Sequence, residues 1–174
     1  MKIVADLSTE RLNVFSEDTP YRCDFTNTVR NLKNRYRKDN EIVYATTGDR
    51  SENGHFPVDP DKFPKGNWLV TSIFEIERSH YSTEIEYHEA IKTFGKVVIT
   101  TNAFRYTKVW SLVDGYYDKP IEMMIRDTQF WIHGSDYKTS WGCIIIPDER
   151  VMYELAKICK EEYKKNGRFP IEVI

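Results

Sequence analysis

The sequence predicts a mainly β protein with flanking helices, a β-rich α+β fold, in a single domain covering residues 1–174. Short runs of β-branched and aromatic residues recur along the chain, and aromatic residues make up 14% of it. Helical spacing of apolar residues appears in two segments, residues 82–94 and 148–166. A chain of 174 residues can bury roughly two thirds of its unfolded surface, which suffices for one core.

Apolar alternation and runs of β-branched residues predict the strands. They cover residues 2–7, 11–15, 41–47, 68–76, 97–101, 107–113, 130–132, 144–146 and 169–174. The first two form a hairpin around the polar segment 8–10. Residues 26–40 are basic and polar, and a solvated helix or loop is favoured there over a binding patch. Residues 48–54 are predicted to be a loop.

The two helices carry recognisable end signals. In residues 82–94, Ile85, His88 and Ile91 fall at near-helical spacing, and Gly95 can end the helix. Asp148 is a typical N-cap for the second helix, which runs to about residue 166 with Gly167 as its stop. Its apolar face consists of Val151, Met152, Leu155, Ala156, Cys159 and Tyr163.

A histidine and a cysteine lie at the ends of two apolar runs. The segment from Ile132 to Ile144 reads IHGSDYKTSWGCI. The flanking runs predict strands that carry His133 and Cys143 at facing ends, in a hairpin with an enlarged turn. A cysteine nucleophile needs a nearby base and donors for an oxyanion. Gly142 leaves room for a carbonyl oxygen beside the Gly142 and Cys143 N–H groups. The alternatives are a small buried cysteine and an ordinary strand-end histidine.

This His-Gly and Ser-x-Gly-Cys-Ile pattern resembles the signature of the L,D-transpeptidase (YkuD-like) catalytic domain, a cysteine acyltransferase acting on bacterial peptidoglycan. Further segments are similar to landmarks of that domain. Residues 3–15 resemble its opening hairpin, residues 44–48 its second strand and residues 64–68 its Pro-x-Gly-x-aromatic turn. The resemblance covers about residues 1–75 and 120–150, and it implies a β-sandwich or barrel carrying the Cys/His site, plus a C-terminal helix.

The resemblance implies a role for each residue of the segment. His133 is the base that takes the proton of the Cys143 thiol, and a backbone carbonyl at Gly134 or Ser135 orients His133. Trp141, Gly142 and Cys143 provide oxyanion donors. Ser140 shapes the turn before Cys143, and Trp141 either lines the groove or packs locally. Lys138 is the nearest candidate for binding a substrate carboxylate, unless it is a solvated loop lysine. No metal or organic cofactor is implied.

Two departures from the family pattern bear on the substrate. Many members carry a histidine where this chain has Trp141, and an arginine thought to hold a substrate carboxylate where it has Ile145. The short His-to-Cys spacing is more like the branch found in secreted antibacterial effectors. Three functions therefore stay open: an L,D-transpeptidase, an L,D-carboxypeptidase or secreted or phage-type effector that trims stem peptides, and a wall-binding module without catalysis.

Charge and hydropathy bear on which partners the protein binds and where it acts. A net charge of −2 and a pI near 6.1 give no indication of a nucleic-acid partner. No segment is long and apolar enough to span a membrane, and the N-terminal residues show no secretory signal. A peptidoglycan enzyme acts in the periplasm or the wall, so we expect a removed signal, another secretion route, phage delivery, or action on wall fragments inside the cell. Any immunity or secretion partner stays unknown.

The remaining histidines and cysteines show no ligand pattern. His55, His80 and His88 have no cysteine or carboxylate partners at zinc-binding spacing, so surface or local structural roles are expected. Cys23 and Cys159 follow no metal or disulfide spacing, and Cys159 is expected in the core. Arg126 and Asp127 are expected to fix the entry of the His133 strand rather than to touch substrate.

Overall fold

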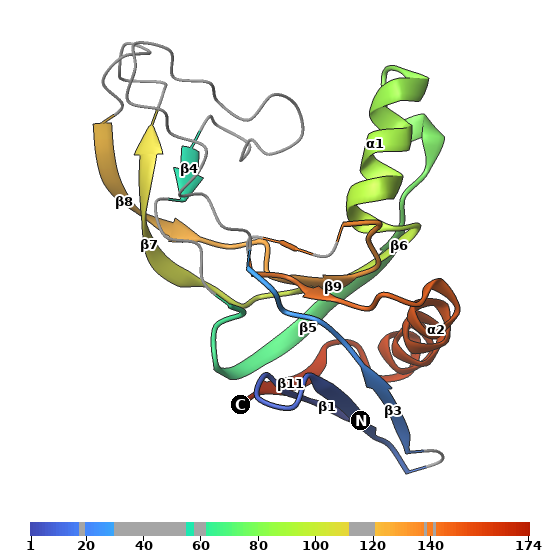
Figure 1. Ribbon diagram of the computed structural model, residues 1–174. Helices are drawn as coiled ribbons and strands as arrows, with labels where there is room; N and C mark the ends of the chain where they lie inside the picture. Colours follow the sequence, from blue (N-terminus) through green and yellow to red (C-terminus); the bar gives the residue numbers. More distant parts are fainter. Residues whose placement is uncertain (18–19, 30–54, 58–61, 112–120, 138, 141) are drawn as a thin grey trace.

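The strands of the protein form two sheets in the computed structural model (Figure 1). The structure describes residues 1–17, 20–29, 55–57, 62–111, 121–137, 139–140 and 142–174. The expected strand 41–47, Lys138 and Trp141 lie outside the described residues. The larger sheet has eight strands in the order β10-β9-β6-β5-β11-β1-β2-β3. They are β1 (Lys2–Asp6), β2 (Arg11–Phe15), β3 (Tyr21–Asp24), β5 (Gly66–Glu75), β6 (Val97–Thr101), β9 (Trp131–His133), β10 (Ile144–Ile145) and β11 (Phe169–Val173).

A smaller sheet of three strands, β4-β7-β8, stands at one side of the larger one (Figure 1). It comprises β4 (His55–Pro57), β7 (Arg105–Ser111) and β8 (Ile121–Asp127), with β7 and β8 antiparallel over their whole length. The mainly β class is therefore confirmed. Strands β3, β4 and β8 were not among the predicted elements, and β7 begins two residues before its predicted start at residue 107.

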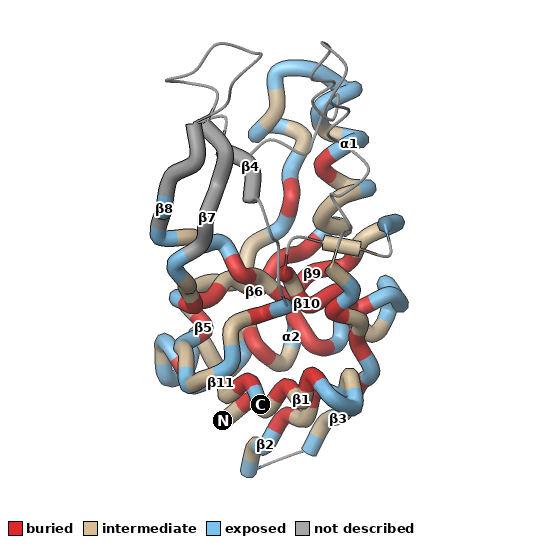
Figure 2. Tube along the Cα trace, turned by 60° about the vertical axis from the view of Figure 1, so that its left-hand side comes forward, coloured by how far each residue is buried: buried red, intermediate tan, exposed pale blue. Residues whose placement is uncertain are grey.

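The eight-stranded sheet curls around the helix α2 (Glu149–Asn166), which lies against its concave face (Figures 1 and 2). The buried side chains of α2 are Met152, Leu155, Ala156 and Cys159. They join one core with alternate residues of the strands, among them Ile3, Leu12, Ile99, Ile132, Ile144 and Ile171. This alternation is the pattern expected of strands with one face in the core.

Helix α2 begins and ends at the predicted caps, and α1 ends at the predicted Gly95. Asp148 accepts hydrogen bonds from the N–H groups of Arg150 and Val151, and Gly167 ends α2 with a φ of 74°. The helix α1 (Glu84–Phe94) starts two residues later than residue 82 because Thr83 is its N-cap, within a capping box that Glu86 completes. None of the described helices combines the length and hydropathy needed for a membrane crossing.

Helix α1 covers the opposite face of the sheet from α2. A second apolar cluster forms there from Ile76, Ala90 and Val98, with Phe94 and Trp131 packed against it. The turn η1 (Arg78–His80) leads from β5 into this helix. Residues of β9 that do not face the α2 core therefore lie on the α1 side of the sheet, and His133 is one of them.

The chain after β3 crosses to the far edge of the curled sheet and pairs with β10. Thr26 and Ile145 exchange two backbone hydrogen bonds of 2.8 and 2.9 Å, and the Ser140 N–H donates to the Thr28 carbonyl at 3.1 Å. These contacts bring residues 26–29 beside the Cys143 segment. They place the segment after β3 against β10, which lies at the other end of the strand order.

The two strands of the candidate motif pair in parallel, so the predicted hairpin of the His133 and Cys143 strands is wrong. Ile144 lies opposite Ile132, and Ile145 lies opposite His133. The antiparallel partner of β9 is β6 instead, which aligns Val98 with His133. The segment between the motif strands is long enough to return across the end of the sheet, and the pairing of Ile145 with Thr26 favours this direction.

Candidate active site

Cys143 stands immediately before β10, at the edge of the curled sheet. Its side chain is partly buried, and the thiol donates to the Gln129 carbonyl oxygen over 3.5 Å. Gln129 is one of two non-glycine residues with positive φ in the described part of the chain, at 66°. That conformation costs energy for a residue with a side chain. The turn between β8 and β9 thus places the Gln129 carbonyl against the thiol at a conformational cost.

His133 ends β9 and is buried, with 3% of its surface exposed. Its Nδ1 lies 2.5 Å from the Gly134 carbonyl oxygen. A carbonyl oxygen only accepts, so Nδ1 carries the proton and Nε2 is the basic nitrogen. The ring packs edge-on against Phe94 of α1, with centroids 5.4 Å apart. This arrangement provides the kind of backbone-oriented imidazole that a general base needs, with Gly134 as its partner.

The structure places His133 at the end of β9 and Cys143 immediately before the neighbouring strand β10. The register puts Ile145 opposite His133, so Cys143 is two residues out of register with it. With the usual strand spacing and rise, their Cα atoms lie about 8 Å apart. No hydrogen bond joins the two side chains, both of which the structure describes. Contact between Sγ and Nε2 therefore requires the thiol to leave the Gln129 carbonyl.

Burial keeps both groups neutral in this resting arrangement. It lowers the pKa of His133 from 6.5 to about 4, against the opposing effect of the Gly134 hydrogen bond. It raises the pKa of the Cys143 thiol from 9.0 to about 11. The Trp131 backbone and the charge of Arg105 lower this thiol pKa, and the charge of Asp127 raises it. A neutral imidazole is the correct form for a base, whereas the thiol needs an incoming group to favour ionisation.

Ser140 organises the turn that leads to the cysteine. Its Oγ accepts the Gly142 N–H at 3.1 Å and donates to the Cys143 carbonyl at 3.0 Å. Gly142 has a φ of 124°, which a residue with a side chain rarely adopts. The local hydrogen-bonding role expected for Ser140 is thus present. The Gly142 N–H, expected as an oxyanion donor, is occupied by Ser140 Oγ, whereas the Cys143 N–H has no acceptor within the described part of the chain.

Asn27 holds the backbone of the cysteine turn from the segment that follows β3. It is 0% exposed, and its Nδ2 donates to the carbonyl oxygens of Gly142 and Cys143, both at 2.9 Å. Its Oδ1 accepts the Phe63 N–H at 3.0 Å, and its own N–H donates to Glu10 Oε1 at 3.1 Å. Asn27 was missed from the sequence because it lies in the segment interpreted as polar and solvated. No local motif marks it.

The loop after His133 packs on the C-terminal end of α1. The Lys92 carbonyl accepts hydrogen bonds from the Asp136 N–H at 2.8 Å and from Ser135 Oγ at 3.1 Å. Ser135 therefore anchors the loop and does not reach Cys143, while Gly134 supplies the carbonyl to His133. Gly95 packs against Gly134 so closely that a Cβ on Gly95 would stand 3.1 Å from the Gly134 Cα.

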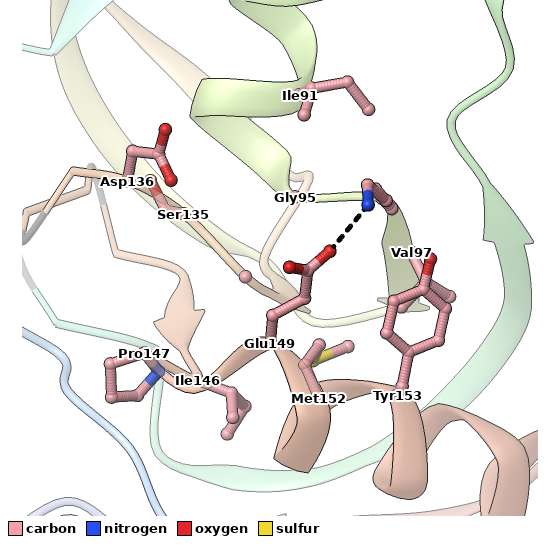
Figure 3. Close-up of a pocket in the computed structure, with 12 residues that line it drawn as sticks. Ile91, Gly95, Val97, Ser135, Asp136, Ile146, Pro147, Glu149, Met152 and Tyr153 are labelled. Atoms are coloured by element: carbon pink, nitrogen blue, oxygen red, sulfur yellow. Dashed lines mark ion pairs between the residues drawn. The ribbon is translucent and has the colours of Figure 1, made fainter.

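A pocket lies behind this loop, away from the cysteine. Figure 3 shows Ser135 and Asp136 on one side of it and Glu149 and Tyr153 of α2 on another. The Glu149 carboxylate pairs with Lys96 Nζ across the pocket at 3.0 Å. Cys143 does not line it. The pocket is therefore separate from the candidate nucleophile. It lies where the loop after His133 packs against α1 and α2.

Arg105 and Asp127 lie close enough to Cys143 to influence the pKa of its thiol. They stand opposite one another on β7 and β8, and Arg105 Nε lies 3.5 Å from Asp127 Oδ2. Asp127 ends β8 shortly before β9, as its expected role in the strand entry suggests. Arg105 was missed from the sequence, since its strand carries no motif. Within the described residues no group of histidine, cysteine or carboxylate side chains is arranged to hold a metal.

No protein-family model matches the sequence, and no curated protein matches it. Among solved structures, the chain is similar to a structure of Bdellovibrio bacteriovorus Bd1075, with 15% sequence identity and a TM-score of 0.48. That similarity covers 99% of this chain and 46% of the other, so this chain spans less than half the length of that protein. The function proposed next rests on the residues of this chain.

Proposed function

We propose that the protein is a cysteine acyltransferase of the L,D-transpeptidase (YkuD-like) type that acts on peptidoglycan stem peptides. The observation that carries the proposal is the Nδ1 hydrogen bond of His133 to the Gly134 carbonyl. It leaves Nε2 as a base on the strand that pairs with the strand following Cys143. A backbone-oriented imidazole beside a Gly-Cys turn suits nucleophilic catalysis better than either residue suits core packing.

In the proposed reaction the Cys143 thiol exchanges the Gln129 carbonyl for His133 Nε2 and transfers its proton there. The sulfur then attacks the carbonyl carbon of an L-to-D peptide bond, and the Cys143 N–H donates to the developing oxyanion. The bond to the leaving D-amino acid breaks, and His133 returns the proton to the leaving amine. An acceptor amine then attacks the thioester carbonyl, His133 takes the amine proton and passes it to the sulfur as the C–S bond breaks, and the free Cys143 thiol is restored beside a cross-linked or exchanged peptide.

A second candidate function is L,D-carboxypeptidase, in which water resolves the same thioester. Ile145 favours it, because the position where many family members carry a carboxylate-binding arginine is occupied here by an apolar residue that is 1% exposed. That position cannot bind a substrate carboxylate. The nucleophile and the base keep the same roles, so a trimming effector with this chemistry uses the same site.

A third candidate, a wall-binding module, is favoured by the absence of a hydrogen bond between Cys143 and His133. A carbapenem separates it from the enzymes, because the β-lactam carbonyl acylates a competent cysteine nucleophile. The acyltransferase predicts a stoichiometric adduct on Cys143, detected by intact mass, that is lost in Cys143→Ala. A protein that gives no adduct at high carbapenem concentration, and does not change stem peptides, contradicts both enzymatic proposals.

Product analysis on a stem tetrapeptide then distinguishes the two enzymes. Loss of the terminal D-Ala alone indicates a carboxypeptidase, whereas dimers or exchanged D-amino acids indicate a transpeptidase. Cys143→Ala and His133→Ala should each abolish turnover, and the double variant should be no worse than either single variant, since the two groups act as one unit. Cys159→Ala is the matched cysteine control, because Cys159 is buried in the α2 core and should affect stability only.

A further inference from the structure

The guanidinium of Arg105 is held rigidly beside the cysteine turn. It stacks over the Phe130 ring, with Cζ 5.0 Å from the ring centroid. Its Nη1 donates to the Lys62 carbonyl at 3.2 Å, and its Nε lies 3.5 Å from Asp127 Oδ2. Contacts to an aromatic face, a carbonyl and a carboxylate fix both the position and the plane of the group.

Two nitrogens of this fixed group lack hydrogen-bond partners. Nε and Nη2 of Arg105 are buried and have no partner, and the side chain as a whole is only 15% exposed. The approach of Asp127 to Nε is an ion pair whose geometry falls short of a hydrogen bond. Buried charged donors without partners are costly, so each one in a native structure calls for a specific explanation, such as a functional role or a bound ion.

The turn between β8 and β9 connects this arginine to the nucleophile. Asp127 and Phe130 contact Arg105, while the Gln129 carbonyl accepts the Cys143 thiol. Neighbouring residues of this one short segment therefore contact both the Arg105 guanidinium and the Cys143 sulfur. In a peptide whose scissile carbonyl lies at Cys143, the nearest carboxylates are one or two residues from the attacked carbon. The residues of this turn that contact Arg105 and Cys143 are separated by a similar length of chain.

We propose that Arg105 binds a carboxylate of the stem peptide, and so takes the role that Ile145 cannot fill. This inference rests on the proposed function for the identity of the substrate. Nη2 and the second N–H of Nη1 offer the planar fork that matches a carboxylate in a bidentate manner. Asp127 engages the Nε edge and orients the guanidinium, which leaves Nη2 for the substrate. The carboxylate belongs either to the terminal D-amino acid or to the diaminopimelate side chain.

The test measures binding of three stem tetrapeptides to a Cys143→Ala background, in which no turnover occurs. One peptide is unmodified, one has its terminal carboxylate amidated and one has its diaminopimelate carboxylate amidated. Arg105→Gln should weaken binding of the unmodified peptide at least tenfold and leave one amidated peptide unaffected. The unaffected peptide identifies which carboxylate Arg105 contacts. Arg105→Lys keeps the charge but loses the fork, so it should weaken binding of the unmodified peptide by a smaller factor.

Arg126→Gln is the matched control, because Arg126 is the neighbouring arginine of β8 and is exposed over Phe104 rather than buried beside Cys143. It should bind all three peptides as the Cys143→Ala parent does. Equal weakening of all three peptides by Arg105→Gln and Arg105→Lys, in variants with unchanged thermal unfolding, would overturn the carboxylate assignment. If Arg105→Gln does not fold, the same comparison with Arg105→Lys decides the point.

Binding and turnover separate the two proposals. If the protein with Cys143 intact turns over the stem peptide while the Arg105 variants bind all three peptides with the same change in affinity, the carboxylate site is rejected and the enzymatic function is supported. If Arg105 substitutions change the relative affinities for the three peptides, but the protein gives neither a carbapenem adduct nor turnover, the carboxylate site is supported and the enzymatic function is rejected. Discrimination together with a thioester on Cys143 supports both.

Discussion

Asn27 donates a 2.9 Å hydrogen bond from its buried side chain to the carbonyl oxygen of Cys143, 116 residues further along the chain. The same amide group donates to the Gly142 carbonyl and accepts the Phe63 N–H. Three segments with no sequence motif in common are thus joined through one side chain at the candidate nucleophile. The position of the Cys143 backbone therefore depends on this contact as well as on the strand β10 that follows it.

Replacement of Asn27 should therefore destabilise the fold and disturb the site together. Asn27→Ala leaves the buried Phe63 N–H and the Gly142 carbonyl without this partner, at about 1–3 kcal/mol for each group that stays unsatisfied, whereas the Cys143 carbonyl keeps Ser140 Oγ. We expect a loss of at least about 2 kcal/mol in urea unfolding, and a lower kcat. Asn166→Ala is the control, since Asn166 is exposed and its side chain donates to Glu162 of the same helix. Similar unfolding free energies for the two variants would contradict this role of Asn27 in holding the Gly142 and Cys143 backbone.

Elements with local end signals could be predicted closely. Helix α2 begins after Asp148 and ends before Gly167 because both caps are written in the adjacent sequence. Strand β6 was predicted with its observed bounds, since Val97 to Thr101 is a β-branched run bordered by polar residues. Strand β8 was missed, although it lies directly before the motif, because its apolar residues do not alternate cleanly between Ile121 and Asp127.

The direction of the motif strands depended on a partner distant in the chain. A polar segment between two apolar runs favours a hairpin when only neighbours are considered. Here Ile145 pairs with Thr26, and His133 aligns with Val98 of β6, so β9 and β10 run in parallel. The sequence pattern selects the candidate residues of the motif, but their mutual geometry, the occupied Gly142 N–H and the proximity of Arg105 follow from tertiary contacts that no local pattern encodes.

Reactivity of the Cys143 thiol should rise steeply with pH in the protein without substrate. Burial raises its pKa to about 11, so the thiolate fraction increases about tenfold per pH unit between pH 7 and 10. Iodoacetamide labelling followed by mass spectrometry measures this rate, and Cys143→Ala should remove it. Cys23 and Cys159 are buried with pKa values of about 12, which limits background labelling. A plateau below pH 8 would indicate a resting thiolate–imidazolium pair and contradict the neutral arrangement.

Protonation of His133 should destabilise the fold in mild acid. Its pKa falls from 6.5 in the unfolded chain to about 4 in the folded protein, so the unfolded state binds the proton more readily. The neutral form contributes its full stability above pH 6.5, and this is lost as the pH falls through 4, by about 3 kcal/mol in total. His133→Asn retains a donor for the Gly134 carbonyl without titrating. Urea unfolding from pH 7 to 4 should show a steeper decline in the parent than in this variant; parallel curves would exclude His133 as the cause.

Two glycines with similar backbone angles test how α1 supports the histidine loop. Gly95 and Gly167 follow α1 and α2 with φ values of 67° and 74° and ψ values of −162° and −145°, a backbone region nearly restricted to glycine, so alanine at either position meets a similar cost of roughly 1–3 kcal/mol. Gly167 faces open space, whereas a Cβ on Gly95 approaches the Gly134 backbone to 3.1 Å. Gly95→Ala should therefore cost about 1–3 kcal/mol more than Gly167→Ala in thermal or urea unfolding. Because Gly134 supplies the carbonyl that orients His133, Gly95→Ala should also lower the carbapenem acylation rate of Cys143, and Gly167→Ala should leave it unchanged. Equal losses of stability and equal acylation rates in the two variants would show that the close approach of Gly95 to Gly134 does not hold the imidazole.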